Sequence, residues 1–170
     1  SNFAAGVNAG NSITSGGNYN TVVGDEAGTA LSTGDFNTFI GYVAGDAIDT
    51  SSENVAIGAN ALTTDTKGSK AVAVGKGSLG SQNFSSATDS HNTAVGYESG
   101  KDIITGTSNT IIGGLAGSTF TTGLRNTLVG ANSGLALVTS NSDNTFMGQG
   151  AGSAITSGDA NTIIGRYSGN

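Results

Sequence analysis

Apolar and polar residues recur along the chain with a period of seventeen. The clearest copies read Asn-Thr-apolar-apolar-Gly, as at residues 37–41 and 109–113. A small Ala/Ser-Gly pair and a later apolar-Thr-Thr/Ser-Gly segment complete each copy. A fixed period of this size is typical of a solenoid, in which each repeat buries its apolar side chains against its neighbours. The copies begin at residues 2, 20, 37, 54, 71, 92, 109, 126, 144 and 161.

Each copy predicts two short β-strands. The Asn-to-Gly stretch favours a strand because β-branched and aromatic residues are enriched in it and glycine ends it. A weaker second strand is expected at the later apolar-Thr-Thr/Ser segment, as at residues 31–34 and 120–123. Glycines such as Gly24 and Gly41 would supply the positive φ of the corners. The predicted fold is an all-β solenoid, a β-roll of about ten coils that forms one continuous repeat domain over residues 1–170.

Successive side chains of a strand point to opposite faces. The fourth position of the first strand is aliphatic from Val23 to Ile164, so it is assigned to the interior of the roll, together with the later apolar position. The third position varies in size and is assigned to the outside, where other chains must cover it. A homotrimer is favoured over a dimer, and successive Asn and Thr side chains are expected to form ladders along the rod. The predicted subunit interface consists of Val22, Phe39, Ile111, Leu128, Phe146 and Ile163.

The central copies, at residues 54–58 and 71–75, resemble the head repeats of trimeric autotransporter adhesins. The outer copies, as at residues 121–127, resemble the related repeats of phage tail-fibre proteins. This resemblance implies a left-handed parallel β-roll that assembles as a homotrimer. Leu62 and Leu79 depart from the pattern because they replace the glycine of the small pair. In these two coils the second-strand apolar residue is expected to have moved three positions earlier.

The composition argues against several classes of function. A net charge of -6 and only six basic residues disfavour nucleic acid as a partner, which needs clustered Lys and Arg. No apolar run approaches the roughly 18 residues of a membrane-spanning helix. Asp89, Ser90 and His91 are consecutive and therefore cannot converge as a hydrolytic triad. No catalytic, cofactor-binding or metal-binding residue is predicted, and the chain is not expected to be an enzyme.

One irregular step points to a contact site. The interval from Ala71 to Asn92 is 21 residues, so an insertion lies within residues 80–91. Insertions in repeat proteins map to surface loops that often bind ligands, although a loop without a role is the open alternative. Phe84, the one aromatic residue within residues 80–91, would contact a cell-surface glycan or receptor. The candidate contact residues are Gln82, Asn83, Phe84, Asp89 and His91.

Basic and aromatic residues suggest two further contacts. Lys67, Lys70 and Lys76 hold half of the basic residues and could attract an anionic sugar, or they could simply solvate the surface and balance Asp65. Tyr42, Tyr97 and Tyr167 closely follow strand-ending glycines. They could stack on sugar rings or pack at a subunit boundary.

The favoured hypothesis is a structural and adhesive rod in an extracellular fibre, either a phage tail fibre or a surface adhesin that contacts a host. Its partners would be further copies of the chain and a surface glycan or receptor, with no cofactor, nucleic acid or membrane insertion. An ice-binding solenoid is the alternative, because threonine recurs at the second strand position. Val55 and Val72 interrupt that row, and it is expected to share a face with the core aliphatics. A self-assembling filament and a polysaccharide depolymerase remain further possibilities.

Overall fold

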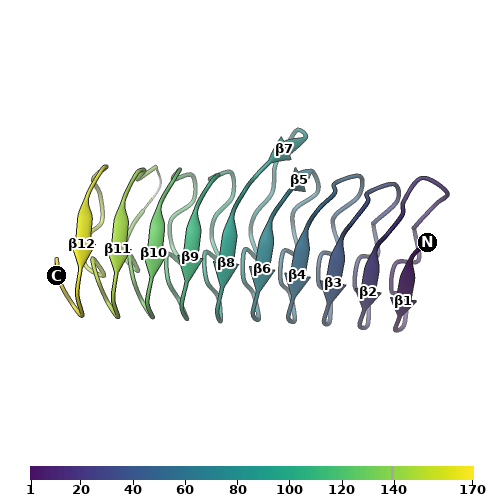
Figure 1. The fold of residues 1–170 in the computed structure, drawn as a ribbon, viewed down its shortest axis with the longest axis horizontal. Helices are drawn as coiled ribbons and strands as arrows, with labels where there is room; N and C mark the ends of the chain where they lie inside the picture. The colour runs from purple at the N-terminus through teal and green to yellow at the C-terminus, as the bar shows by residue number, and fades with distance from the viewer. Residues whose placement is uncertain (139) are drawn as a thin grey trace.

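The computed structural model of the chain, which describes residues 1–138 and 140–170, is a β-solenoid (Figure 1). Ten three-residue strands form one parallel sheet in which neighbours follow the order of the sequence. Their register pairs equivalent positions of successive coils, so that Thr38 lies between Thr21 and Val55. The strands of this sheet are β1 (Phe3–Ala5), β2 (Thr21–Val23), β3 (Thr38–Ile40), β4 (Val55–Ile57), β6 (Val72–Val74), β8 (Thr93–Val95), β9 (Thr110–Ile112), β10 (Thr127–Val129), β11 (Thr145–Met147) and β12 (Thr162–Ile164). The predicted all-β solenoid with a coil of about 17 residues is confirmed.

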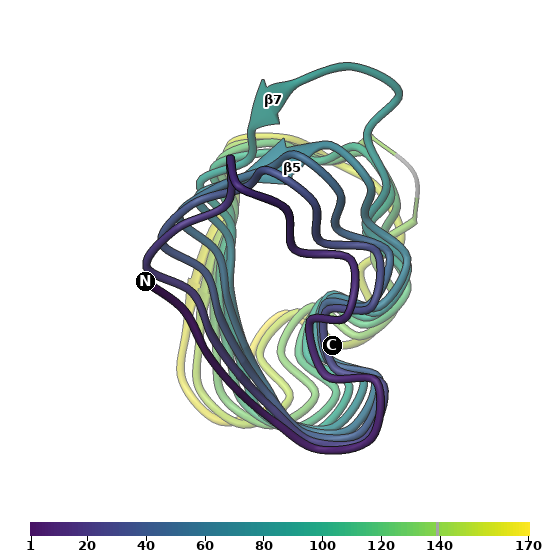
Figure 2. The same ribbon diagram turned by 90° about the vertical axis from the view of Figure 1, so that its right-hand side faces the viewer.

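Viewed along the rod, the coils have a similar outline and are offset gradually from one end to the other, and one loop departs from this outline (Figure 2). Here β5 (Gly68–Ser69) and β7 (Thr88–Asp89) pair in parallel as a separate two-stranded sheet. The chain that leads into β7 projects beyond the outline of the other coils. The longer step of the repeat therefore produces a local arch and leaves the register of the main sheet unchanged, since Val72 still pairs with Thr93.

The expected second strand is absent from residues 31–34 and 120–123, which form bends and irregular structure. Backbone hydrogen bonds do join neighbouring coils there, as from the Ser32 amide to the Asp49 carbonyl at 2.9 Å. These contacts are isolated because the chain turns again within a few residues, at Phe36 with a φ of 58°. These few backbone hydrogen bonds do not form a continuous strand, so the prediction of two strands in every coil was wrong.

The glycine that ends each strand of the main sheet is required by the turn. Its φ lies between 122° and 137° in all ten coils, a region that is essentially closed to residues with a Cβ. A Cβ built on Gly41 would lie 2.7 Å from the carbonyl carbon of Gly58 in the next coil. Positive φ at these corners was predicted from the sequence and is confirmed.

The two faces of the main sheet are the reverse of the prediction. The third strand position points into the coil: Val22, Phe39, Ile111, Leu128 and Phe146 are fully buried, and Ile163 packs against the same core. The fourth position points outward, so that side chains such as Ile40 and Ile112 are exposed. Of the six residues predicted as a subunit interface, five are fully buried within their own chain and Ile163 is half-buried against the same core, so they do not form a subunit interface. Side chains alternate along a strand, so the third position lies on the same face as the asparagine at the first position. The two faces were assigned wrongly because this polar asparagine is itself buried.

The buried asparagines form the predicted ladder. In coil after coil, the Oδ1 atom of one asparagine accepts hydrogen bonds from the next asparagine, as Asn20 does from the backbone amide and Nδ2 of Asn37 at 2.8 and 3.1 Å. The Nδ2 group of Asn37 also donates to the Ser51 carbonyl at 2.9 Å. Burial is tolerated because each side chain in the run is satisfied by its own coil and by the adjacent ones.

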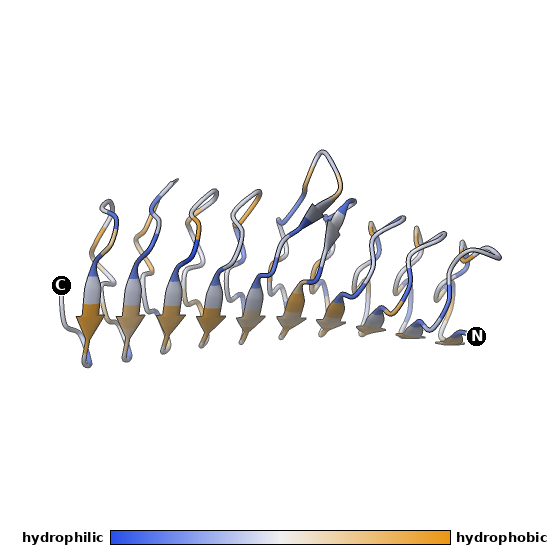
Figure 3. Cartoon of the chain, turned by 45° about the horizontal axis from the view of Figure 1, so that its top comes forward, coloured by the Kyte–Doolittle hydropathy of each residue, from blue (hydrophilic) through white to orange (hydrophobic). Residues whose placement is uncertain are grey.

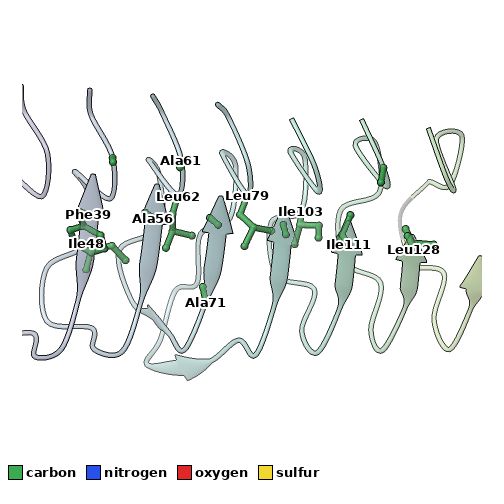
Figure 4. Close-up of a cluster of buried hydrophobic side chains, with 14 of the residues drawn as sticks. Phe39, Ile48, Ala56, Ala61, Leu62, Ala71, Leu79, Ile103, Ile111 and Leu128 are labelled. Atoms are coloured by element: carbon green, nitrogen blue, oxygen red, sulfur yellow. The ribbon is translucent and has the colours of Figure 1, made fainter. Parts of the chain in front are cut away.

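Side chains at two positions of the coil fill the core together: where the residue at one position is large, the residue at the other is small. Gly45 leaves room for a large third-position residue, since a Cβ there would lie 2.7 Å from Cδ1 of Phe39. In the two central coils, the third-position residues are Ala56 and Ala73, and Leu62 and Leu79 replace the glycine and fill the interior (Figure 4). The expected shift of the apolar residue by three positions is confirmed by the complete burial of both leucines.

Candidate functional site

The outer face of the main sheet is one candidate interaction surface. It presents the second and fourth strand positions, which are threonine or valine and then an aliphatic residue in most coils. We call this surface the outer face. Ile40, Ile112 and Met147 are 37%, 41% and 42% exposed there. Figure 3 shows the apolar strand residues aligned from coil to coil along the rod.

The outer face also lacks charge. None of the residues at the second and fourth strand positions is Asp, Glu, Lys or Arg, although the chain contains eighteen such residues. Nine strand spacings of about 4.8 Å make this face roughly 43 Å long. An uncharged surface of that length with a continuous row of aliphatic side chains is typical of a surface that meets another body.

The inserted loop divides into buried and exposed residues. Asn83, Asp89 and His91 are exposed, in line with their predicted place on a contact loop. Gln82 is fully buried and Phe84 is 5% exposed, so neither can contact a ligand at the surface. The predicted role of Phe84 as an aromatic contact for a glycan was therefore wrong. Its ring packs inward, over the backbone of Gly68.

Asp65 holds the base of the inserted loop. Its carboxylate is fully buried, and Oδ1 accepts hydrogen bonds from the backbone amides of Gly68 at 2.9 Å, Lys67 at 3.2 Å and Phe84 at 3.3 Å. Oδ2 accepts a bond from Nε2 of Gln82 at 2.6 Å. The sequence contained a signal for this cluster, because Asp65 and Gln82 stand where other coils have a buried apolar residue such as Ile48.

The cluster is joined to the asparagine ladder. Oε1 of Gln82 accepts a hydrogen bond from Nδ2 of Asn92 at 2.8 Å, and Oδ1 of Asn92 accepts one from Nδ2 of Asn109 at 3.2 Å. The ladder then continues through further asparagines to Asn161. It is interrupted at Ala71, where the coil has no amide side chain. Gln82 thus connects the C-terminal run of amides to the carboxylate of Asp65.

The three lysines beside the loop have different surroundings. Lys70 forms an exposed ion pair with Asp89, with Nζ and Oδ2 2.5 Å apart. Hydrogen bonding within this pair raises the pKa of Lys70 and lowers the pKa of Asp89. Nζ of Lys76 lies 5.8 Å from the ring centre of Tyr97, and Lys67 is exposed. The suggestion that lysines balance Asp65 was wrong, because amide donors satisfy its carboxylate.

None of the described residues belongs to a helix that could cross a lipid bilayer. Within residues 1–138 and 140–170, three or more His, Cys, Asp or Glu side chains do not come together as potential metal ligands. Comparison with protein-family models, curated proteins and solved structures gave no match for this chain.

Proposed function

We propose that the chain is a structural and adhesive rod segment of an extracellular fibre, assembled as a homotrimer through the outer face. The observation that carries the proposal is the uncharged aliphatic rank that continues in register over all ten strands of the main sheet. Further copies of the chain fit this surface best because they offer an equally long and equally uncharged rank. Their packing would remove aliphatic side chains from water, at about 25 cal/mol for each Å² buried.

A trimer also compensates for the thin interior of a single coil. The interior of a coil holds only a few apolar side chains, as Phe39, Ala44 and Ile48 do in the coil that begins at Asn37. Solenoids with so small a core gain stability from each additional buried surface. The outer face is the surface that can supply it without rearranging the coil.

Light scattering coupled to size exclusion tests the assembly. The wild-type chain is expected to elute with three times the 16.5 kDa of one chain. Replacing Ile40 and Ile112 by lysine should shift the species to a single chain, because each trimer would bury six unpaired ammonium groups at several kcal/mol each.

Ile104→Lys provides the matched control. Ile104 is 43% exposed, close to the 41% of Ile112, but it lies outside the main sheet. This variant should remain trimeric. A wild-type chain that stays at 16.5 kDa throughout the micromolar range contradicts the proposal.

Ice binding is the second candidate, and the orientation of the threonines favours it. They share the outer face with the fourth position and do not lie beside the core, contrary to the expectation from the sequence. In this case the chain would remain monomeric with its outer face open to solvent, and it would separate the freezing and melting points of ice. Thr127→Lys should abolish this gap between the freezing and melting points. A wild-type chain that produces no such gap would exclude ice binding. The threonines concerned are Thr21, Thr38, Thr93, Thr110, Thr127, Thr145 and Thr162.

A further inference from the structure

A pocket of about 310 Å³ lies in the turns that follow β4, β6 and β8. It spans three successive coils and is centred on the coil that begins at Ala71. That coil has glycine, Gly77 and Gly80, at two positions of the turn. The adjacent coils have Asn60 and Glu98 at the first of these positions and Thr63 and Lys101 at the second. The pocket is therefore the space that two missing side chains leave in an otherwise regular edge.

The turn does not require glycine at residue 77. Equivalent residues have φ between 50° and 67° throughout the rod, and Asn60 and Asn132 adopt 57° and 59° without difficulty. At Gly150 the ring of Tyr167 occupies the space of the missing side chain. A Cβ at Gly77 would meet only Cγ of Glu98, at 3.3 Å, so the space there stays open.

Polar residues and glycine line the pocket, and its charged side chains carry a net positive charge. Lys76 and Lys101 face one carboxylate, that of Glu98, in a chain whose net charge is -6. Glu98 is held by Nζ of Lys101 at 3.5 Å. Its hydrogen bond with Tyr97, together with the nearby lysines, lowers the pKa of its carboxyl, so that it is ionised at neutral pH. Asn60, Thr63 and Ser81 add amide and hydroxyl groups.

We infer that this pocket binds an acidic sugar residue, a ligand with one carboxylate and several hydroxyls. The two ammonium groups would pair with the ligand carboxylate, as charge-assisted hydrogen bonds are the strong ones. Glu98, Asn60 and Thr63 would exchange hydrogen bonds with its hydroxyls. The exposed ring of Tyr97, beside Lys76, offers an apolar face at the rim. All of these residues belong to one chain, so the pocket is complete whether or not the chain forms a trimer.

Saturation-transfer NMR with D-glucuronate as the probe, and D-glucose as its neutral counterpart, tests the inference. Glucuronate should show transfer from the protein at millimolar concentration, and glucose should show little. Gly77→Asn should abolish the glucuronate signal, because it fills the pocket with the residue that the same fold accepts at Asn60 and Asn132. Lys76→Met and Lys101→Met should each weaken the affinity about tenfold, the loss expected for one charge-assisted contact.

Gly114→Asn is the matched control, since a Cβ at Gly114 has no atom within 4 Å and this residue lies outside the pocket. It should bind glucuronate like the wild-type chain. Circular dichroism of Gly77→Asn should match the wild-type spectrum, so that loss of binding reports the filled pocket. Equal binding of glucuronate by Gly77→Asn, or no transfer to glucuronate in the wild-type chain, would overturn the inference.

Discussion

Asp65→Ala is expected to lower the free energy of unfolding by about 3–5 kcal/mol. The substitution removes the acceptor for the backbone amides of Gly68 and Phe84 and for Nε2 of Gln82, which would remain buried without partners. Urea denaturation at one fixed protein concentration measures the loss. Hydrogen exchange should locate it, because the amides of Gly68 and Phe84 would lose protection first.

Two variants separate the hydrogen bonds of Asp65 from its charge. Asp65→Asn keeps one oxygen for the backbone amides but places its own NH₂ group against Nε2 of Gln82, so that two donors face each other. The side-chain amide of Gln82 cannot flip to relieve this, because its Oε1 accepts a hydrogen bond from Asn92. We expect a smaller loss of about 1–3 kcal/mol. Asp25→Ala removes an exposed carboxylate and should change stability by less than about 0.5 kcal/mol. Equal stability of Asp65→Ala and Asp25→Ala would show that the cluster does not stabilise the loop.

Asn109→Ala is expected to cost about 2–4 kcal/mol, the second largest effect. The change removes the acceptor for the backbone amide and Nδ2 of Asn126 at 2.9 and 3.1 Å. It also removes the donor to the Gly123 carbonyl at 2.9 Å. These groups are inside the coil, where water cannot replace the lost partner. Urea denaturation again provides the measurement.

The same substitution at the end of the rod is its control. Asn161 is only half-buried and receives no bond from a further asparagine in the chain, so Asn161→Ala should cost less than about 1 kcal/mol. A similar loss at both positions would indicate that the ladder adds little beyond the contacts of a single asparagine. Ala71 shows how the fold tolerates a gap, because the amide of Asn92 is met by Oγ of Ser90 at 3.4 Å in place of a ladder oxygen.

The fold could be predicted because its signals are repeated. The short strand recurs ten times, and the glycine that ends it identifies the corner in every copy, so an error in one coil is corrected by the others. The assignment of faces had no such support. Val22 and Val23 are both apolar, and only the burial of the neighbouring Asn20 shows which of them points inward. A buried asparagine is costly in a single strand and becomes favourable only in a stack, which the pattern of one repeat does not reveal.

The candidate sites were harder to predict because they depend on exceptions to the repeat. Phe84 was expected at the surface since it stands in a polar loop, but the space above Gly68 and the cluster at Asp65 draw it inward. The sequence gives no sign that Lys101 belongs with Lys76, because the two residues are far apart along the chain. The solenoid brings it to the pocket through the turn of the next coil. The structure is needed to see that Gly77 and Gly80 occupy positions of the turn where the adjacent coils have larger side chains.

The in-register stacking of the main sheet also makes the length of the rod adjustable. The hydrogen bonds of Asn109 to its neighbours are repeated in kind by those of Asn126. Loss of the seventeen residues 109–125 would therefore bring the coil of Asn126 onto that of Asn92 with equivalent partners. Each gain or loss of one coil would change the length by about 4.8 Å. A gene that duplicates or deletes this unit can therefore set the length of the solenoid in steps of one coil, without a change in the hydrogen bonds of the ladder.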